Sequence, residues 1–106
     1  MMPKTPLDIL GRLVYEYNHA YDEWQKNGQA YSLTRAMLPI LQEASIDLLR
    51  TANLTLCEPS TLGMRQQHMT AALVRNLGSV PGKITSTSQV NWDLTLQTLR
   101  SLESVR

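Results

Sequence analysis

The longest regular pattern of apolar residues runs from Pro6 to Asn27, where apolar side chains recur three and four positions apart. This spacing places them on one face of a helix. Thr5 can cap the first turn, Pro6 suits the first helical position, and Gly28 can take the left-handed conformation that ends a helix. We therefore expect a helix over residues 6–27. Its predicted core face carries Leu10, Leu13, Tyr17, Tyr21 and Trp24.

A second helix is predicted over residues 33–53, with Ser32 as its N-cap. Pro39 interrupts the pattern, and an interior proline costs roughly 3 kcal/mol. Either the helix bends at Pro39 or it begins at about Leu38. The connection from the first helix is only a few residues long, so the two helices should pack as an antiparallel hairpin.

Two further helices are expected after the loop at Pro59. One covers about residues 61–77 and ends at Gly78, although Gly63 weakens its first turn by about 0.5–1 kcal/mol. The other covers about 88–105. Its start is ambiguous, because apolar residues first alternate as in a strand and then recur at helical spacing. Residues 83–96 could thus be helical, extended or a loop.

These elements predict an all-α fold: a small four-helix, bundle-like domain built on the long N-terminal hairpin. The chain has 106 residues, a length that suits one domain over residues 1–106. A lone strand near residue 90 would leave its backbone groups unpaired, which favours a helix there.

The formal net charge is only +1, so the overall charge gives no reason to expect nucleic acid or an acidic membrane as a partner. Residues 1–58 contain seven acidic and five basic residues, whereas residues 59–92 contain three basic residues and no acid. Helical spacing predicts supportive pairs of Arg12 with Glu16, of His19 with Glu23 and of Asp22 with Lys26. The segment 59–92 is therefore the one electropositive region, and its field is weak.

The single cysteine, Cys57, excludes an internal disulfide framework and suits a reducing compartment. No apolar run approaches the ~18 residues of a membrane span. We expect a cytoplasmic protein without a membrane partner.

The sequence offers little material for catalysis. Glu16 and His19 have the spacing of half a di-metal site on a helix bundle, but His68, the other histidine, is preceded at that spacing by Arg65. No Gly-x-Ser-x-Gly elbow, phosphate-binding loop or paired-cysteine motif is present. We therefore predict no enzyme, no catalytic residues, no metal site and no cofactor.

The leading functional prediction is a non-enzymatic protein-interaction or assembly module that binds another macromolecule and self-associates as a homo-oligomer. It rests on the missing chemistry and on apolar residues that lie off the main core stripes, such as Ile46. Tyr15 lies opposite the apolar face of the first helix, beside Arg12 and His19. The candidate contact residues are Tyr15, Arg12, His19 and Ile46.

An alternative is a small DNA-binding regulator that uses about residues 70–94. This segment loosely resembles the turn of a helix-turn-helix, with Leu73, Leu77, Gly78 and Ile84 at matching positions. The resemblance implies nucleic-acid contacts through Arg65, Arg75, Lys83, Thr85, Ser86 and Gln89. A third reading is a small-ligand sensor that uses the tyrosine and tryptophan face of the first helix.

Overall fold

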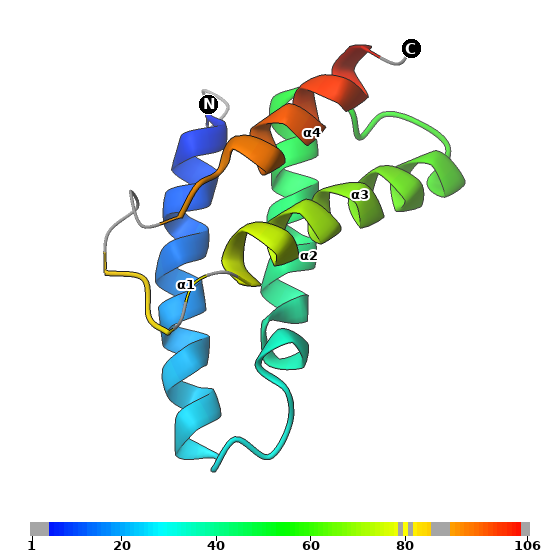
Figure 1. Cartoon of the computed structure of the whole chain (residues 1–106). Helices are drawn as coiled ribbons and strands as arrows, with labels where there is room; N and C mark the ends of the chain where they lie inside the picture. Colours follow the sequence, from blue (N-terminus) through cyan, green and yellow to red (C-terminus); the bar gives the residue numbers. More distant parts are fainter. Residues whose placement is uncertain (1–4, 79, 81, 86–89, 105–106) are drawn as a thin grey trace.

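Four helices and no strand are formed by the residues that the computed structural model describes, namely 5–78, 80, 82–85 and 90–104. The helices are α1 (Pro6–Lys26), α2 (Leu33–Thr51), α3 (Pro59–Gly78) and α4 (Asp93–Ser104). α1 and α2 lie side by side in opposite directions, α3 crosses α2, and α4 packs on α3 (Figure 1). The predicted all-α, four-helix, bundle-like fold is confirmed.

α1 begins and ends at the residues that the sequence marks as caps. The Thr5 hydroxyl accepts a hydrogen bond from the Asp8 N–H, and the Asp8 carboxylate accepts one from the Thr5 N–H, both at 3.2 Å. This reciprocal pair satisfies donors that the first turn leaves without a helical partner. At the other end Gly28 and Gln29 have φ angles of 68° and 58°, the left-handed conformation that stops a helix.

Pro39 lies inside α2, so the helix does not begin at Leu38. α2 begins at Leu33, where the Ser32 hydroxyl accepts a hydrogen bond from the Arg35 N–H at 3.1 Å. Met37 and Leu41, on either side of the proline, are each only 2% exposed. Their burial offsets the roughly 3 kcal/mol that an interior proline costs, which is why the helix continues through it.

α2 is the central helix, because it contacts α1 on one side and α3 on the other. Leu48 and Leu49 are 0% exposed, and so is the polar residue Ser45. The Ser45 hydroxyl donates to the Leu41 carbonyl at 2.7 Å and lies 2.8 Å from the Thr70 hydroxyl of α3. The buried hydroxyl is therefore satisfied, and it ties α3 to α2 at their crossing.

α4 begins at Asp93, so the predicted start at residue 88 is wrong. Asn91 and Trp92 are not helical. The Asn91 side chain accepts a hydrogen bond from the Asp93 N–H at 3.0 Å, and the Asn76 side chain of α3 accepts one from the Thr95 N–H at 3.1 Å. Asn76 thus caps α4 from another helix. Sequence spacing along α4 cannot reveal a cap that comes from α3.

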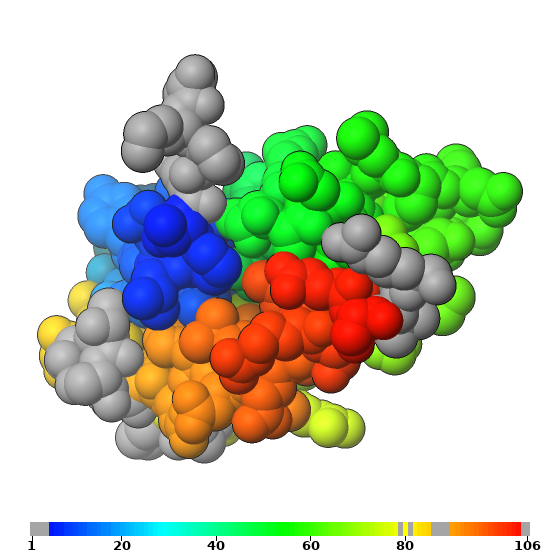
Figure 2. Space-filling view, turned by 90° about the horizontal axis from the view of Figure 1, so that it is seen from above, coloured from blue at the N-terminus to red at the C-terminus, as the bar shows by residue number. Residues whose placement is uncertain are grey.

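The connection between α3 and α4 supplies part of the core. Its buried side chains are Val80, Ile84, Val90 and Trp92. The described residues of this connection are not helical, and Gly82 and Ile84 lie against α1, where Tyr17 and Asn18 bind their backbone (Figure 1). Seen from above, α4 lies beside the first turns of α1 (Figure 2). The core therefore extends from the hairpin to both later helices.

Among the described helices, none combines the length and hydropathy needed to cross a membrane.

Candidate protein-binding surface

The outer face of α1, which we define as Arg12, Tyr15, Glu16 and His19, is open to solvent. Tyr15 is 77% exposed, and Arg12 and His19 are also exposed. Arg12 pairs with Glu16 at 3.3 Å as its spacing predicts, and such an exposed pair contributes only about 0.3–0.5 kcal/mol. Three of the four predicted protein contacts, Tyr15, Arg12 and His19, are therefore accessible on one helix face.

Ile46 has a different environment from these three residues. It lies on α2, is half-buried and packs against the apolar core. Part of its apolar surface is already covered by the protein itself. Ile46 therefore offers less contact area than its position in the sequence pattern indicates.

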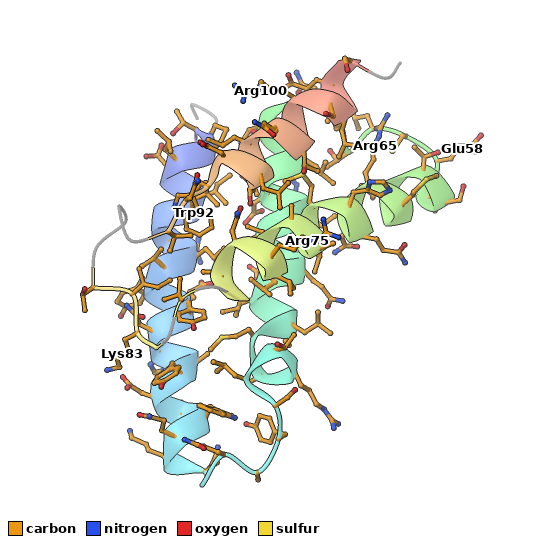
Figure 3. The ribbon with its side chains drawn as sticks, in the orientation of Figure 1. Glu58, Arg65, Arg75, Lys83, Trp92 and Arg100 are labelled. Atoms are coloured by element: carbon orange, nitrogen blue, oxygen red, sulfur yellow. The ribbon has the colours of Figure 1, made fainter. Side chains whose placement is uncertain are left out.

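The residues predicted to contact nucleic acid do not form one basic patch. Arg65, Arg75 and Lys83 lie well apart (Figure 3). Arg65 donates to the Leu54 carbonyl at 2.8 Å, and the Lys83 ammonium lies 2.6 Å from the Asp22 carboxylate. Arg75 is exposed on α3. Two of the three cations are thus occupied by contacts within the chain.

The helix-turn-helix expected near Gly78 is not seen in the described residues. Gly82, Lys83, Ile84 and Thr85 are not helical, although the resemblance places the start of a second helix there. Ser86 and Gln89 lie outside the described residues. The next helix begins only at residue 93.

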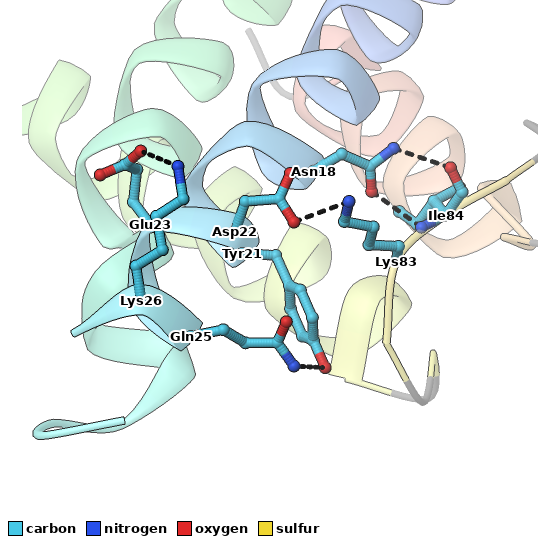
Figure 4. A network of polar contacts seen from close by, with 8 residues as sticks. All are labelled: Asn18, Tyr21, Asp22, Glu23, Gln25, Lys26, Lys83 and Ile84. Carbon is cyan, nitrogen blue, oxygen red and sulfur yellow. Dashed lines mark hydrogen bonds and ion pairs between the residues drawn. The ribbon is translucent and has the colours of Figure 1, made fainter. Parts of the chain in front are cut away.

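A network of polar contacts instead holds Lys83 and Ile84 against α1 (Figure 4). The Asn18 side chain donates to the Ile84 carbonyl and accepts from the Ile84 N–H, both at 2.8 Å. Asp22 pairs with Lys83, and Lys26 pairs with Glu23 at 3.6 Å. The predicted pair of Asp22 with Lys26 is therefore wrong, and Glu23 pairs with Lys26 and not with His19 as predicted. The competing partner, Lys83, is far away in the sequence, so helical spacing could not identify it.

A groove lies between α2 and α3, with a volume of about 560 Å³. We call it the α2–α3 groove, and its lining residues are Leu38, Gln42, Gly63, Gln66, Gln67, Thr70, Ala71, Val74 and Arg75. Leu38 is 38% exposed. Thr70 and Gln66 are already hydrogen-bonded to α2, through Ser45 and the Gln42 carbonyl. Those contacts hold the groove's two walls together.

The row Gly63, Gln67, Ala71 and Arg75 forms the outer wall of this groove, because residues four apart align along a helix. Gln67, Ala71 and Arg75 also line a second hollow, of about 290 Å³, on the α4 side of α3. Met64, on the neighbouring row of α3, is 58% exposed. α3 is thus a ridge with a hollow on each side. The groove was not predicted from the sequence.

Tyr17 lines a smaller hollow of about 160 Å³, together with residues that include Met37, Val74 and Val80. Ligand pockets usually have volumes of about 300–1,000 Å³. The Tyr21 ring on α1 contacts two other aromatic rings of the same helix. Its centroid lies 6.4 Å from that of Tyr17 and 5.5 Å from that of Trp24. Tyr17 is buried and Tyr21 packs against the core, as their phase with the core leucines predicts. Trp24 is half-buried and is not part of the core, so its predicted core position is wrong; its indole N–H donates to the Tyr31 carbonyl at 2.6 Å.

No group of three or more His, Cys, Asp or Glu side chains that could hold a metal occurs within the described ranges. Cys57 is half-buried, and its thiol lies 3.6 Å from the Leu54 carbonyl.

Tyr17 gives the fold a pH dependence at alkaline pH. Burial, and to a smaller extent the neighbouring Tyr21, raises the pKa of the Tyr17 hydroxyl above its ordinary value of 10.0. Folding favours the neutral form, so the associated stability is fully present below pH ~10 and is lost as pH rises through the folded-state pKa. We expect urea unfolding between about pH 8 and about pH 11 to show this loss, and Tyr17→Phe to reduce it.

The same substitution removes the hydrogen bond from the Tyr17 hydroxyl to the Gly82 carbonyl, 3.3 Å away. Tyr17→Phe should therefore lower stability at neutral pH by about 0.5–1.5 kcal/mol. An alkaline loss of equal size in wild type and variant would contradict this assignment.

The chain matches no protein-family model, no curated protein and no solved structure.

Proposed function

We propose that this protein is a non-enzymatic helical interaction module that acts by binding another protein. The observation that carries the proposal is the α2–α3 groove, whose lining combines the exposed apolar residue Leu38 of α2 with Ala71 and Val74 of α3. A partner that covers the exposed apolar surface of Leu38 gains roughly 25 cal/mol per Å² of apolar surface removed from water. A concave apolar surface with a polar rim is typical of sites that bind a segment of another protein.

We also propose that the protein self-associates, as the sequence predicts, through a surface other than the groove. The outer face of α1 suits self-association better than α3 does, because Arg12 and Glu16 supply both charge signs. A symmetric contact between two copies can then pair opposite charges. Sedimentation velocity over a wide protein concentration range measures it directly.

The described side chains give little support to nucleic-acid binding. Lys83 and Arg65 are engaged inside the chain, and Arg75 alone supplies little of the phosphate neutralisation that DNA binding requires.

The proposal is tested by affinity capture from cells that make the protein, quantified by mass spectrometry. We expect a specific partner that the wild type retains and the variant Leu38→Ser retains at least about fivefold less, because the substitution removes apolar contact area from the groove. Leu56→Ser is the matched control, since Leu56 is 92% exposed and does not line the groove. The proposal fails if no protein is specifically retained, or if all three forms retain it equally.

A further inference from the structure

The α2–α3 groove has one charged lining residue, Arg75, and no acidic one. The Arg75 side chain makes no hydrogen bond or ion pair with any other described residue. The whole stretch from residue 59 to residue 92 contains no aspartate or glutamate. The groove therefore ends at a cation whose charge the surrounding residues of the helix do not balance.

The walls of the groove are formed by rows of residues four apart, one on each helix. Gly63, Gln67 and Ala71 form one row of α3, and Leu38 and Gln42 form a row of α2. A partner helix that lies along α3 can pack its own row of side chains against the α3 row. Gly63 and Ala71 are small, so the α3 wall is low and a docked helix can approach closely.

The polar lining residues can also serve a helix partner. Gln67 is exposed and its amide can both donate and accept hydrogen bonds. Leu38, Ala71 and Val74 supply the apolar part of the lining. A partner with an apolar stripe and a polar margin would match both.

We propose that the α2–α3 groove binds an amphipathic helix of a partner protein, with apolar side chains against Leu38, Ala71 and Val74 and a carboxylate against Arg75. This inference rests on the proposed function and specifies its partner. A second copy of this chain is the less suitable occupant, because a symmetric contact through α3 would bring two acid-free, cationic surfaces together. A helix that carries aspartate or glutamate has the complementary charge.

The test uses a display library of amphipathic helices of about 18 residues, or about 27 Å, with a fixed leucine stripe and random residues elsewhere. We expect the selected helices to be enriched in aspartate or glutamate near one end. Arg75→Glu should weaken binding by about tenfold or more, and exchange of the helix carboxylate for lysine should restore it, because the charge pair is then reversed. Arg100→Glu, on α4, is the control and should change affinity by less than about twofold.

Ala71→Trp supplies an independent arm, because Ala71 is exposed and lines the groove. The larger ring should block the helix and weaken binding by more than about twentyfold, while circular dichroism shows an unchanged fold. Selected helices without acidic enrichment, or binding that survives Ala71→Trp, overturn the inference. If no helix is selected but the captured partner still requires Leu38, this inference fails and the proposed function stands. If capture also fails, both fail.

Discussion

Leu48→Ala is expected to lower the free energy of unfolding by about 3–5 kcal/mol. Leu48 is 0% exposed and lies on α2, the helix that contacts both α1 and α3. Removal of the side chain takes away its apolar burial and leaves a cavity between elements that can close only in part. Urea unfolding followed by far-ultraviolet circular dichroism measures the change.

Leu56→Ala is the matched control, because it is the same substitution at a residue that is 92% exposed. It should change stability by less than about 0.5 kcal/mol. Similar losses in the two variants would mean that α2 does not occupy the centre of the core.

Asn18→Ala is expected to cost about 2–3 kcal/mol, because it leaves both polar groups of the Ile84 backbone without their partner. Ile84 is only 3% exposed, and the Asn18 amide both donates to its carbonyl and accepts from its N–H. Hydrogen exchange at the Ile84 amide should accelerate by about tenfold or more, since that N–H loses its acceptor.

His19→Ala is the control for this experiment, because His19 is the next residue of α1 and is exposed. Its effect on stability should stay below about 0.5 kcal/mol. Asn18→Asp separates the two bonds, since a carboxylate still accepts from the Ile84 N–H but cannot donate to its carbonyl. An Ile84 amide that exchanges at the wild-type rate in Asn18→Ala would show that the network does not hold this segment.

The helices were largely predictable because their signals are local. Thr5 and Ser32 cap α1 and α2 as expected, and Gly28 takes its left-handed conformation. The apolar period of each helix identifies the face that becomes buried. α3 begins at Pro59 instead of residue 61, an error of the size that frayed helix ends produce.

The failures concern contacts between residues far apart in the sequence. Asn76 caps α4 across a separation of 19 residues, and Asn18 binds Ile84 across 66. Neither partner can be found from spacing within one helix. The predicted start of the last helix at about residue 88 is also wrong, because Val90 and Trp92 are buried side chains of a segment, residues 90–92, that is not helical.

The candidate surface was predictable only in part for the same reason. Tyr15 was identified as exposed because its helix phase is opposite that of Leu13 and Tyr17. The α2–α3 groove depends on how two helices cross, which the two separate patterns do not determine. The sequence shows that no acidic residue lies near Arg75 along the chain. Only the structure shows that Arg75 also lines the α2–α3 groove.

The central claim is that the α2–α3 groove, and not the outer face of α1, is where a partner helix binds. Amide chemical-shift mapping by NMR, with a selected acidic helix added to the full chain, tests this most directly. The structure predicts that the largest shifts gather at Gln42, Gly63, Gln67, Ala71 and Arg75. Shifts that gather instead at Arg12, Tyr15 and His19 would contradict the account.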